Sequence, residues 1–366
     1  MDWYHNLLKK LAHAQVQYPY FVILIIIGLT LIMTVGSSQV QTVASLELMM
    51  PDYLEPIAAF NTLRDQGLGQ DIIAVVVTLD TSSSLTYLPD GSIDINDYLL
   101  SFEKNLRENT DVLEVYSAAN SPYPEQFITP DGKGTVLLIS TDIGTQDSRM
   151  KALVGDVEAL SKEGLPAGYS VALTGTPSIQ QKLGELIGND RKNTQLYSTL
   201  FVFIILILTF GTFSSAVVPL LVVTTSVTWL YGTMGFVGLP ISTLAGGVAA
   251  MVIGIGIDFA IHIINKFKFE RKKGMTIPHA IEAAVVHTGT SLTITSATTV
   301  AAFLAFMAGI MPEMARFGIL MSLGITYSLL FSIVGLPAAL IVEERILSWI
   351  SKKGHFGVEG EYRLEK

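Results

Sequence analysis

Residues 246–264 read GGVAAMVIGIGIDFAIHII and place one acidic side chain, Asp258, in a stretch that is otherwise apolar or small apart from His262. Upstream of it, residues 193–257 contain no Asp, Glu, Lys, Arg or His. A carboxylate this deep in an apolar helix of bilayer length costs about 2.5–3.5 kcal/mol on insertion scales unless it pairs, takes up a proton or faces water. Such residues mark proton or ion paths more often than structural hydrogen bonds, so Asp258 is the leading functional candidate.

The composition is that of a membrane protein. The 366 residues are 50% hydrophobic and 15% charged, with a mean hydropathy of +0.49. The apolar residues fall in long blocks, and each crossing of a bilayer needs about 20 of them. We therefore predict a membrane α-helical bundle of six transmembrane helices, over residues 18–37, 194–210, 216–236, 243–265, 288–310 and 316–342.

Basic residues indicate the orientation of these helices. With six spans, the basic clusters all fall on one side: Lys9, Lys10, Lys266, Lys268, Arg271, Lys272, Lys273, Arg345, Lys352 and Lys353. The positive-inside rule puts that side, and both termini, in the cytoplasm of a plasma or inner membrane. The first block could be a signal peptide, but its length and the lack of a clear cleavage site favour a retained helix.

The predicted division of the chain follows from this orientation. Residues 1–37 are a cytoplasmic N-terminus and the first helix, and residues 38–193 lie outside. Residues 194–345 form helices two to six, and residues 346–366 are a cytoplasmic tail. The excess of acidic residues in the outer segment argues against nucleic acid as a partner, and the absence of cysteine excludes disulfides.

The outer segment is predicted to hold an α+β domain. Strands are expected at 72–79, 112–117, 135–141 and 169–174, with helices at 96–109 and 147–163. This βαββαβ order is that of a ferredoxin-like sheet with its helices on one face. The segment carries no phosphate loop, His cluster or nucleophile elbow, so we expect a docking or porter domain, no enzyme activity, no cofactor and no metal.

Small and polar residues surround Asp258. Gly254 and Gly256 would let a neighbouring helix approach closely. His262 lies one turn from Asp258 on the same face and either extends a proton path or is a neutral side chain near the helix end.

The fifth span begins with many hydroxyl side chains. Ser291, Thr295, Thr298 and Thr299 recur at helical spacing, with Ser296 beside them. They form either a stripe that hydrogen-bonds a buried carboxylate or a set of side chains that bond their own helix carbonyls. Glu313 and Arg316, at the outer end of the last helix, are expected to pair at the surface.

Several motifs together resemble the resistance-nodulation-division (RND) superfamily, in particular its lipid-exporter branch of mycobacterial large membrane proteins and hopanoid transporters. The main motif is GIGIDFAIH at 254–262, followed by the basic KFKFERKKG at 266–274. TSATT at 295–299, MPD at 50–52 and LTGTP at 173–177 support it. The resemblance covers the whole chain but only one of the two six-helix repeats usual in the family, which implies a half-size member.

The resemblance implies roles for specific residues. Asp258 matches the proton-relay carboxylate of the family, and Ser296 and Thr299 match polar positions on its fifth helix, with Thr295 and His262 beside them. The Tyr that commonly follows the relay Asp is replaced by Phe259. In the family the relay residues of two repeats meet at the centre, so a half-size chain is expected to work as a homodimer.

The sequence is compatible with three functions. The first is a proton-motive-force-driven exporter of hydrophobic or amphiphilic, lipid-like substrates. The second is an accessory subunit of protein secretion of the Sec-associated RND type, for which the residues after Asp258 fit less well. The third is a lipid- or sterol-sensing membrane protein that does not transport. Membrane lipids are expected partners in each case.

Overall fold

The computed structural model describes residues 2–42, 50–51, 53–65, 71–80, 85, 94–144, 147–211, 213–242 and 244–353. The chain divides into two compact units. One comprises Met1–Thr42 with Gly188–Lys366, and the other comprises Val43–Ile187. The first contains most of the long apolar helices and the second contains the sheet.

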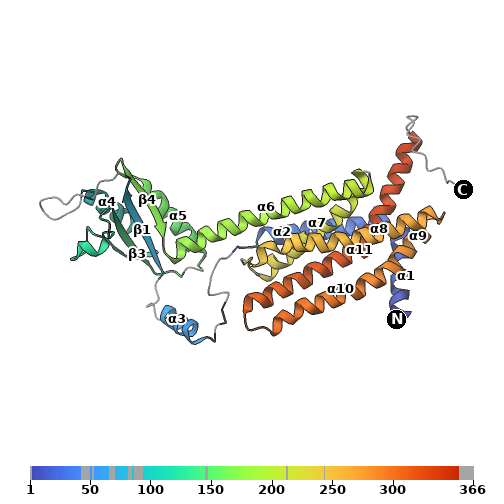
Figure 1. Cartoon of the computed structure of the whole chain (residues 1–366), viewed down its shortest axis with the longest axis horizontal. Helices are drawn as coiled ribbons and strands as arrows, with labels where there is room; N and C mark the ends of the chain where they lie inside the picture. Colours follow the sequence, from blue (N-terminus) through green and yellow to red (C-terminus); the bar gives the residue numbers. More distant parts are fainter. Residues whose placement is uncertain are drawn as a thin grey trace. The chain divides into compact units, whose positions relative to one another are not determined.

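Within the described residues, six helices are long and apolar enough to cross a membrane. They are α2 (Pro19–Ser38), α6 (Thr176–Phe210), α7 (Phe213–Val237), α8 (Val248–Lys272), α10 (Gly289–Leu304) with the short helices around it, and α11 (Pro312–Lys353). In Figure 1, α2, α7, α8, α10 and α11 run alongside one another. The chain is thus a multi-pass membrane protein.

Several of these helices extend beyond their predicted bounds; α8, for example, continues past the predicted end at residue 265 to Lys272. α6 begins at Thr176, before the predicted start at residue 194, and α11 continues to Lys353. The added part of α6, residues 176–193, is polar and includes Lys182, Glu185, Asp190 and Arg191. Hydropathy detects only the apolar part of a helix, whereas the backbone remains helical wherever the residues permit it.

Glycines bring α2 and α7 into close contact. A Cβ added to Gly235 would lie 1.7 Å from the carbonyl oxygen of Gly36, and one added to Gly232 would lie 2.5 Å from that of Met33. No larger residue fits at either position without moving a backbone. Membrane helices commonly associate through small residues in this way. The Trp229 indole on α7 also donates a hydrogen bond to the Thr30 hydroxyl on α2, at 3.0 Å.

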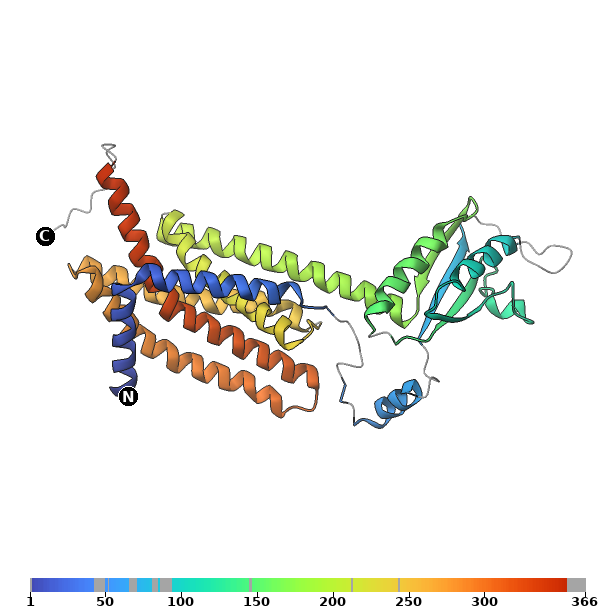
Figure 2. The same cartoon turned by 180° about the vertical axis from the view of Figure 1, so that it is seen from behind.

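Shorter helices complete this unit. They are α1 (Asp2–Gln17), which was not predicted, η3 (Leu244–Gly247), α9 (Ile277–Ala283), the π-helical η4 (Ala284–Thr288) and η5 (Ala305–Ala308). Figure 2 shows α1 crossing one end of the helices, where it packs against α9, η4 and α11. Residues 277–286, which follow the basic KFKFERKKG segment and have an amphipathic sequence, form α9 and the start of η4.

The second unit contains a four-stranded antiparallel sheet. Its strands are β1 (Ile72–Leu79), β2 (Val112–Tyr116), β3 (Gly134–Thr141) and β4 (Tyr169–Thr174), in the order β2-β3-β1-β4. Val75 lies opposite Leu137 on β3 and Leu173 on β4. The predicted bounds of these strands agree with the observed ones to within a residue.

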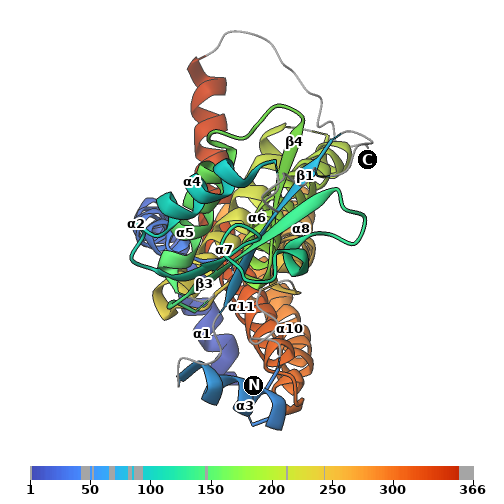
Figure 3. The ribbon, with the colours of Figure 1, turned by 90° about the vertical axis from the view of Figure 1, so that its left-hand side faces the viewer.

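Helices cover one face of this sheet. α4 (Asn96–Leu106) and α5 (Ser148–Lys162) contact each other and lie on the same side of the strands, as Figure 3 shows. Their apolar faces and the sheet form one buried core that includes Ile73, Leu99, Phe102, Ile139 and Val157. Asp147 caps α5, because its carboxylate accepts a hydrogen bond from the Arg149 backbone N–H. The unit also contains α3 (Glu55–Asp65) and the short helix η2 (Pro124–Phe127). The turn predicted at Asp90 and Gly91 lies outside the described residues.

Candidate functional site

Helix α8 has one packed face and one open face. The packed face lies against α7 and α11 and includes Val252, Ile253, Gly256, Ala260 and Ile263, all buried. The open face consists of Met251, Gly254, Asp258, His262 and Asn265, all exposed. Their spacing of three or four residues places them in one line along the helix. We call this line the open stripe of α8.

Asp258 lies in the middle of the open stripe. Within the described part of the chain, no side chain or backbone group donates a hydrogen bond to its carboxylate and no basic residue pairs with it. A carboxylate on the outside of an apolar helix is costly in a lipid environment. The fold of a single chain does not offset that cost.

The two glycines expected to pack helices have different surroundings. A Cβ at Gly256 would lie 2.7 Å from the Ser328 hydroxyl on α11, so this glycine already serves a contact within the chain. A Cβ at Gly254 would meet no atom within 4 Å. Only Gly254 shares the exposed face of Asp258, one turn away. The reason is angular: two residues along a helix correspond to about 200° of rotation.

The hydroxyl groups of α10 are not brought to Asp258 within one chain. α10 packs mainly against α11, and α8 packs against α7 and α11. Thr295 donates to the Ser291 carbonyl at 3.2 Å and Thr299 to the Thr295 carbonyl at 2.9 Å, and Thr298 likewise bonds a carbonyl of its own helix. These bonds agree with the alternative in which the hydroxyl groups bond carbonyls of their own helix and do not reach a buried carboxylate.

Ser296 differs from its neighbours. Its side chain is 2% exposed, and its hydroxyl has no hydrogen-bond partner in the described structure. A buried hydroxyl without a partner is uncommon in native structures. It is therefore the one predicted relay hydroxyl on α10 that its own helix does not satisfy.

The expected surface pair of Glu313 and Arg316 is wrong. Glu313 is 3% exposed and accepts a hydrogen bond from the backbone N–H of Leu244 at 3.1 Å. This bond joins the start of α11 to η3. A backbone donor at a helix start needs an acceptor, and a carboxylate from a neighbouring helix supplies one.

Sequence reasoning missed a buried amide on α1. Gln15 is 1% exposed, and its side-chain amide donates to the carbonyl oxygens of Ile333 at 2.8 Å and Val334 at 3.2 Å on α11. Pro337, four residues after Ile333, has no N–H to donate to that carbonyl. Gln15 replaces the missing donor. A proline inside a predicted membrane helix was the only signal in the sequence that such a donor is needed.

Comparison with known proteins places the chain among multi-pass membrane proteins of one family. The model of the MMPL family matches residues 72–357. A membrane protein of Methanocaldococcus jannaschii is 30% identical over 95% of this chain and 97% of its own length. The chain belongs to the MMPL family, within the RND superfamily, as its motifs implied.

Two mycobacterial relatives are much longer than the matched region. The protein named probable trehalose monomycolate exporter MmpL3 of Mycobacterium leprae is 26% identical over 76% of this chain but only 30% of its own length. The sulfolipid-1 exporter MmpL8 of Mycobacterium tuberculosis is 23% identical over 78% of this chain and 26% of its own length. The chain thus spans less than a third of each of these exporters.

Proposed function

We propose that this protein moves lipid-like amphiphiles across or out of the membrane, driven by the proton gradient, with Asp258 as the group that takes up and releases the proton. The observation that carries the proposal is the carboxylate of Asp258 in the middle of the open stripe of α8, exposed and without a partner among the described residues. The names of the two mycobacterial relatives, both exporters of lipids, support the class of substrate.

The same observation supports a homodimer. In a bilayer the open stripe would place a carboxylate, an imidazole and an amide against lipid, each at a cost. Pairing two copies through α8, about an axis normal to the membrane, would remove all three from lipid at once. Gly254 has open space around it, so it would allow the second α8 to approach closely. Each copy would then bring one Asp258 to the shared interface.

In this proposal the charge of Asp258 selects between two packings of the dimer. Ionised, the two carboxylates repel each other and need water or hydrogen-bond donors; protonated, they can approach. His262, one turn toward the basic loop, would extend the path toward the cytoplasm. Ser296 is buried on α10 and lies away from Asp258 in one chain, so it would donate to the carboxylate only in a packing in which α10 moves; Thr295 and Thr299 remain proposed relay positions on the same helix. A potential of 100 mV supplies about 2.3 kcal/mol for each charge moved.

The second unit would act as the outer, porter domain. Its strand order β2-β3-β1-β4, with two helices on one face, is the arrangement expected of a ferredoxin-like domain. With the basic end of α8 and the residue after it, 266–273, in the cytoplasm, both termini are cytoplasmic and residues 38–193 lie outside. This domain would then receive the amphiphile on the outer side.

The transport experiment uses the full chain in phosphatidylcholine vesicles that contain a panel of fluorescent-tailed amphiphiles and an imposed pH gradient. We expect gradient-dependent movement with the wild type and none with Asp258→Asn, which keeps size and hydrogen bonding but removes the titration. The matched control is Glu282→Gln, the same chemical change in a surface ion pair with Lys9 at 3.7 Å. Wild-type rates in Asp258→Asn, or no gradient dependence in the wild type, would contradict the proposal.

The dimer is tested by crosslinking, which is simple because the chain has no cysteine. Gly254→Cys should form a disulfide-linked dimer in native membranes on mild oxidation. Ala301→Cys, on an exposed part of α10, is the control and should not. If Gly254→Cys stays monomeric and mass measurement in mild detergent finds one chain, the protein does not pair through this face.

A further inference from the structure

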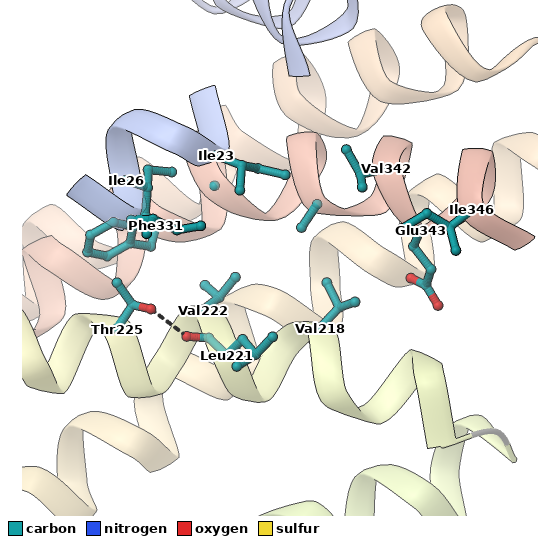
Figure 4. Close-up of a pocket in the computed structure, with 13 residues that line it drawn as sticks. Ile23, Ile26, Val218, Leu221, Val222, Thr225, Phe331, Val342, Glu343 and Ile346 are labelled. Carbon is teal, nitrogen blue, oxygen red and sulfur yellow. Dashed lines mark hydrogen bonds between the residues drawn. The ribbon is translucent and has the colours of Figure 1, made fainter. Parts of the chain in front are cut away.

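A cavity of about 540 Å³ lies between α2, α7 and α11. Figure 4 shows its lining, to which all three helices contribute. The lining residues are mostly aliphatic: Ile23, Ile26, Ile27, Val218, Leu221, Val222, Thr225, Phe331, Gly335, Ala339, Val342, Glu343 and Ile346. It is separate from the open stripe, because α7 and α11 each pack against both α2 and α8.

The cavity presents few polar groups to a ligand. The Thr225 hydroxyl donates to the Leu221 carbonyl at 2.7 Å, so its proton is already used. The other polar lining residue is Glu343, which lies toward the end of α11 and interacts electrostatically with Lys268 on α8. The cavity is therefore apolar along its depth, with charges of both signs near one end. The cavity is partly open, since Ile27 and Leu221 on its wall are exposed, and a space with so few polar groups holds water poorly.

Small residues on α11 create this space. Gly335 and Ala339 lie one turn apart on the cavity wall, on either side of Pro337. A Cβ added to Gly335 would lie 3.2 Å from the Ile26 side chain, so even one methyl group would narrow the cavity. The Gln15 amide bonds the carbonyls beside the proline, which holds this part of α11 in place.

We propose that this cavity binds one alkyl chain of a membrane lipid, with the lipid head group at the Glu343 end. The volume falls in the range of about 300–1,000 Å³ typical of small-molecule sites. The three helices are membrane-spanning, so lipid chains are the apolar molecules available to fill a dry cavity between them. The carboxylate of Glu343 on the cavity wall, with Lys268 close enough to interact with it electrostatically, fits a zwitterionic or uncharged polar head group better than a simple anion.

The location sets which leaflet supplies the lipid. Glu343 and Ile346 lie near the end of α11, and Lys268 belongs to the basic loop region of α8. The bound lipid is therefore one of the leaflet on the side of the basic loop. This site binds lipid whether or not Asp258 carries protons.

The test uses the full chain in phosphatidylcholine vesicles that contain phosphatidylcholine with a diazirine in its acyl chain. After illumination, mass spectrometry should find labelled peptides from α2, α7 and α11 that include cavity residues. Ile27→Trp fills the cavity from α2 and should lower this labelling about tenfold, since the ring displaces several buried methylene groups. Leu24→Trp is the matched control, because Leu24 is exposed on the same helix and does not line the cavity.

Ala339→Phe blocks the cavity from α11 and serves as the second variant if Ile27→Trp does not fold. Both must elute as the wild type does on size exclusion. Equal labelling of cavity and non-cavity peptides in the wild type would overturn the proposal. So would cavity labelling that persists in folded Ile27→Trp or Ala339→Phe. Loss of transport in Asp258→Asn with unchanged labelling would show that the two sites are independent.

Discussion

Two carboxylates in the helical unit have opposite surroundings. Glu313, at the start of α11, is buried and accepts a hydrogen bond from the Leu244 backbone. Asp258, in the middle of α8, is exposed and has no partner among the described residues. Glu313 is therefore used by the fold, whereas Asp258 contributes nothing to the fold of one chain. A costly group that the fold does not use is available for function.

The largest expected effect is on transport, and it distinguishes Asp258 from Glu313. Asp258→Asn should reduce gradient-driven transport to background while the thermal midpoint in detergent stays within error of the wild type, because no contact within the chain is lost. Fluorescence transport assays and thermal melts of the same preparation measure both. A large fall in the midpoint would mean that Asp258 is structural after all.

Glu313→Ala should show the reverse pattern. The backbone N–H of Leu244 loses its acceptor, which costs about 1–3 kcal/mol for a buried polar group. We expect a lower thermal midpoint, with gradient dependence retained in the protein that stays folded. Unchanged stability would show that water or another group replaces the carboxylate.

The two glycines of α8 extend the same comparison to helix packing. Gly256→Leu should prevent proper folding, because a Cβ alone would lie 2.7 Å from the Ser328 hydroxyl. A Cβ at Gly254 meets no atom within 4 Å among the described residues, so Gly254→Leu should leave the monomer folded. If α8 pairs with a second copy, Gly254→Leu should weaken the dimer, as mass measurement in mild detergent would show. A dimer unaffected by Gly254→Leu would place the interface elsewhere.

We expect the hydroxyl groups of α10 to have a smaller effect, on the pH profile of transport, that differs between Thr299 and Ser296. Thr299 bonds its own helix, so Thr299→Val should leave the pH profile of transport unchanged. Ser296 has an unsatisfied hydroxyl, so Ser296→Ala is the variant expected to move the profile upward if this group stabilises the ionised carboxylate. Identical profiles for both variants would remove Ser296 from the relay.

The smallest expected effect is on the stability of the sheet unit at alkaline pH. Burial raises the pKa of Tyr98 to about 12, and its hydroxyl donates to the Ser161 carbonyl at 2.5 Å. Because the folded pKa is above the unfolded value of about 10, the stabilisation is complete below pH 10 and is lost as the pH rises toward 12. Tyr98→Phe should cost about 1 kcal/mol near neutral pH and weaken this alkaline loss. Amide hydrogen exchange in α4 and α5 of the full chain measures both. An unchanged alkaline profile in Tyr98→Phe would assign the loss to another group.

The sequence alone was sufficient to locate the six spans and the four strands of the sheet. The six spans follow from runs of apolar residues long enough to cross a bilayer, and the strands of the sheet follow from β-branched runs such as IIAVVVTL at 72–79. Both signals are local, since each depends on the residues of one segment. Asp258 was found in the same way, because a lone carboxylate in an apolar run needs no neighbours to be conspicuous.

Contacts between segments could be decided only by the tertiary structure. Gly254 and Gly256 look alike in the sequence, yet only Gly256 is covered by another helix of the chain. The sequence suggested that Glu313 pairs with nearby Arg316, whereas it bonds Leu244, far away in the chain. The Gln15 amide and the cavity between α2, α7 and α11 had no local signal beyond Pro337. Hydropathy and periodicity describe which face of a helix is apolar, but which helix covers that face depends on packing between distant segments.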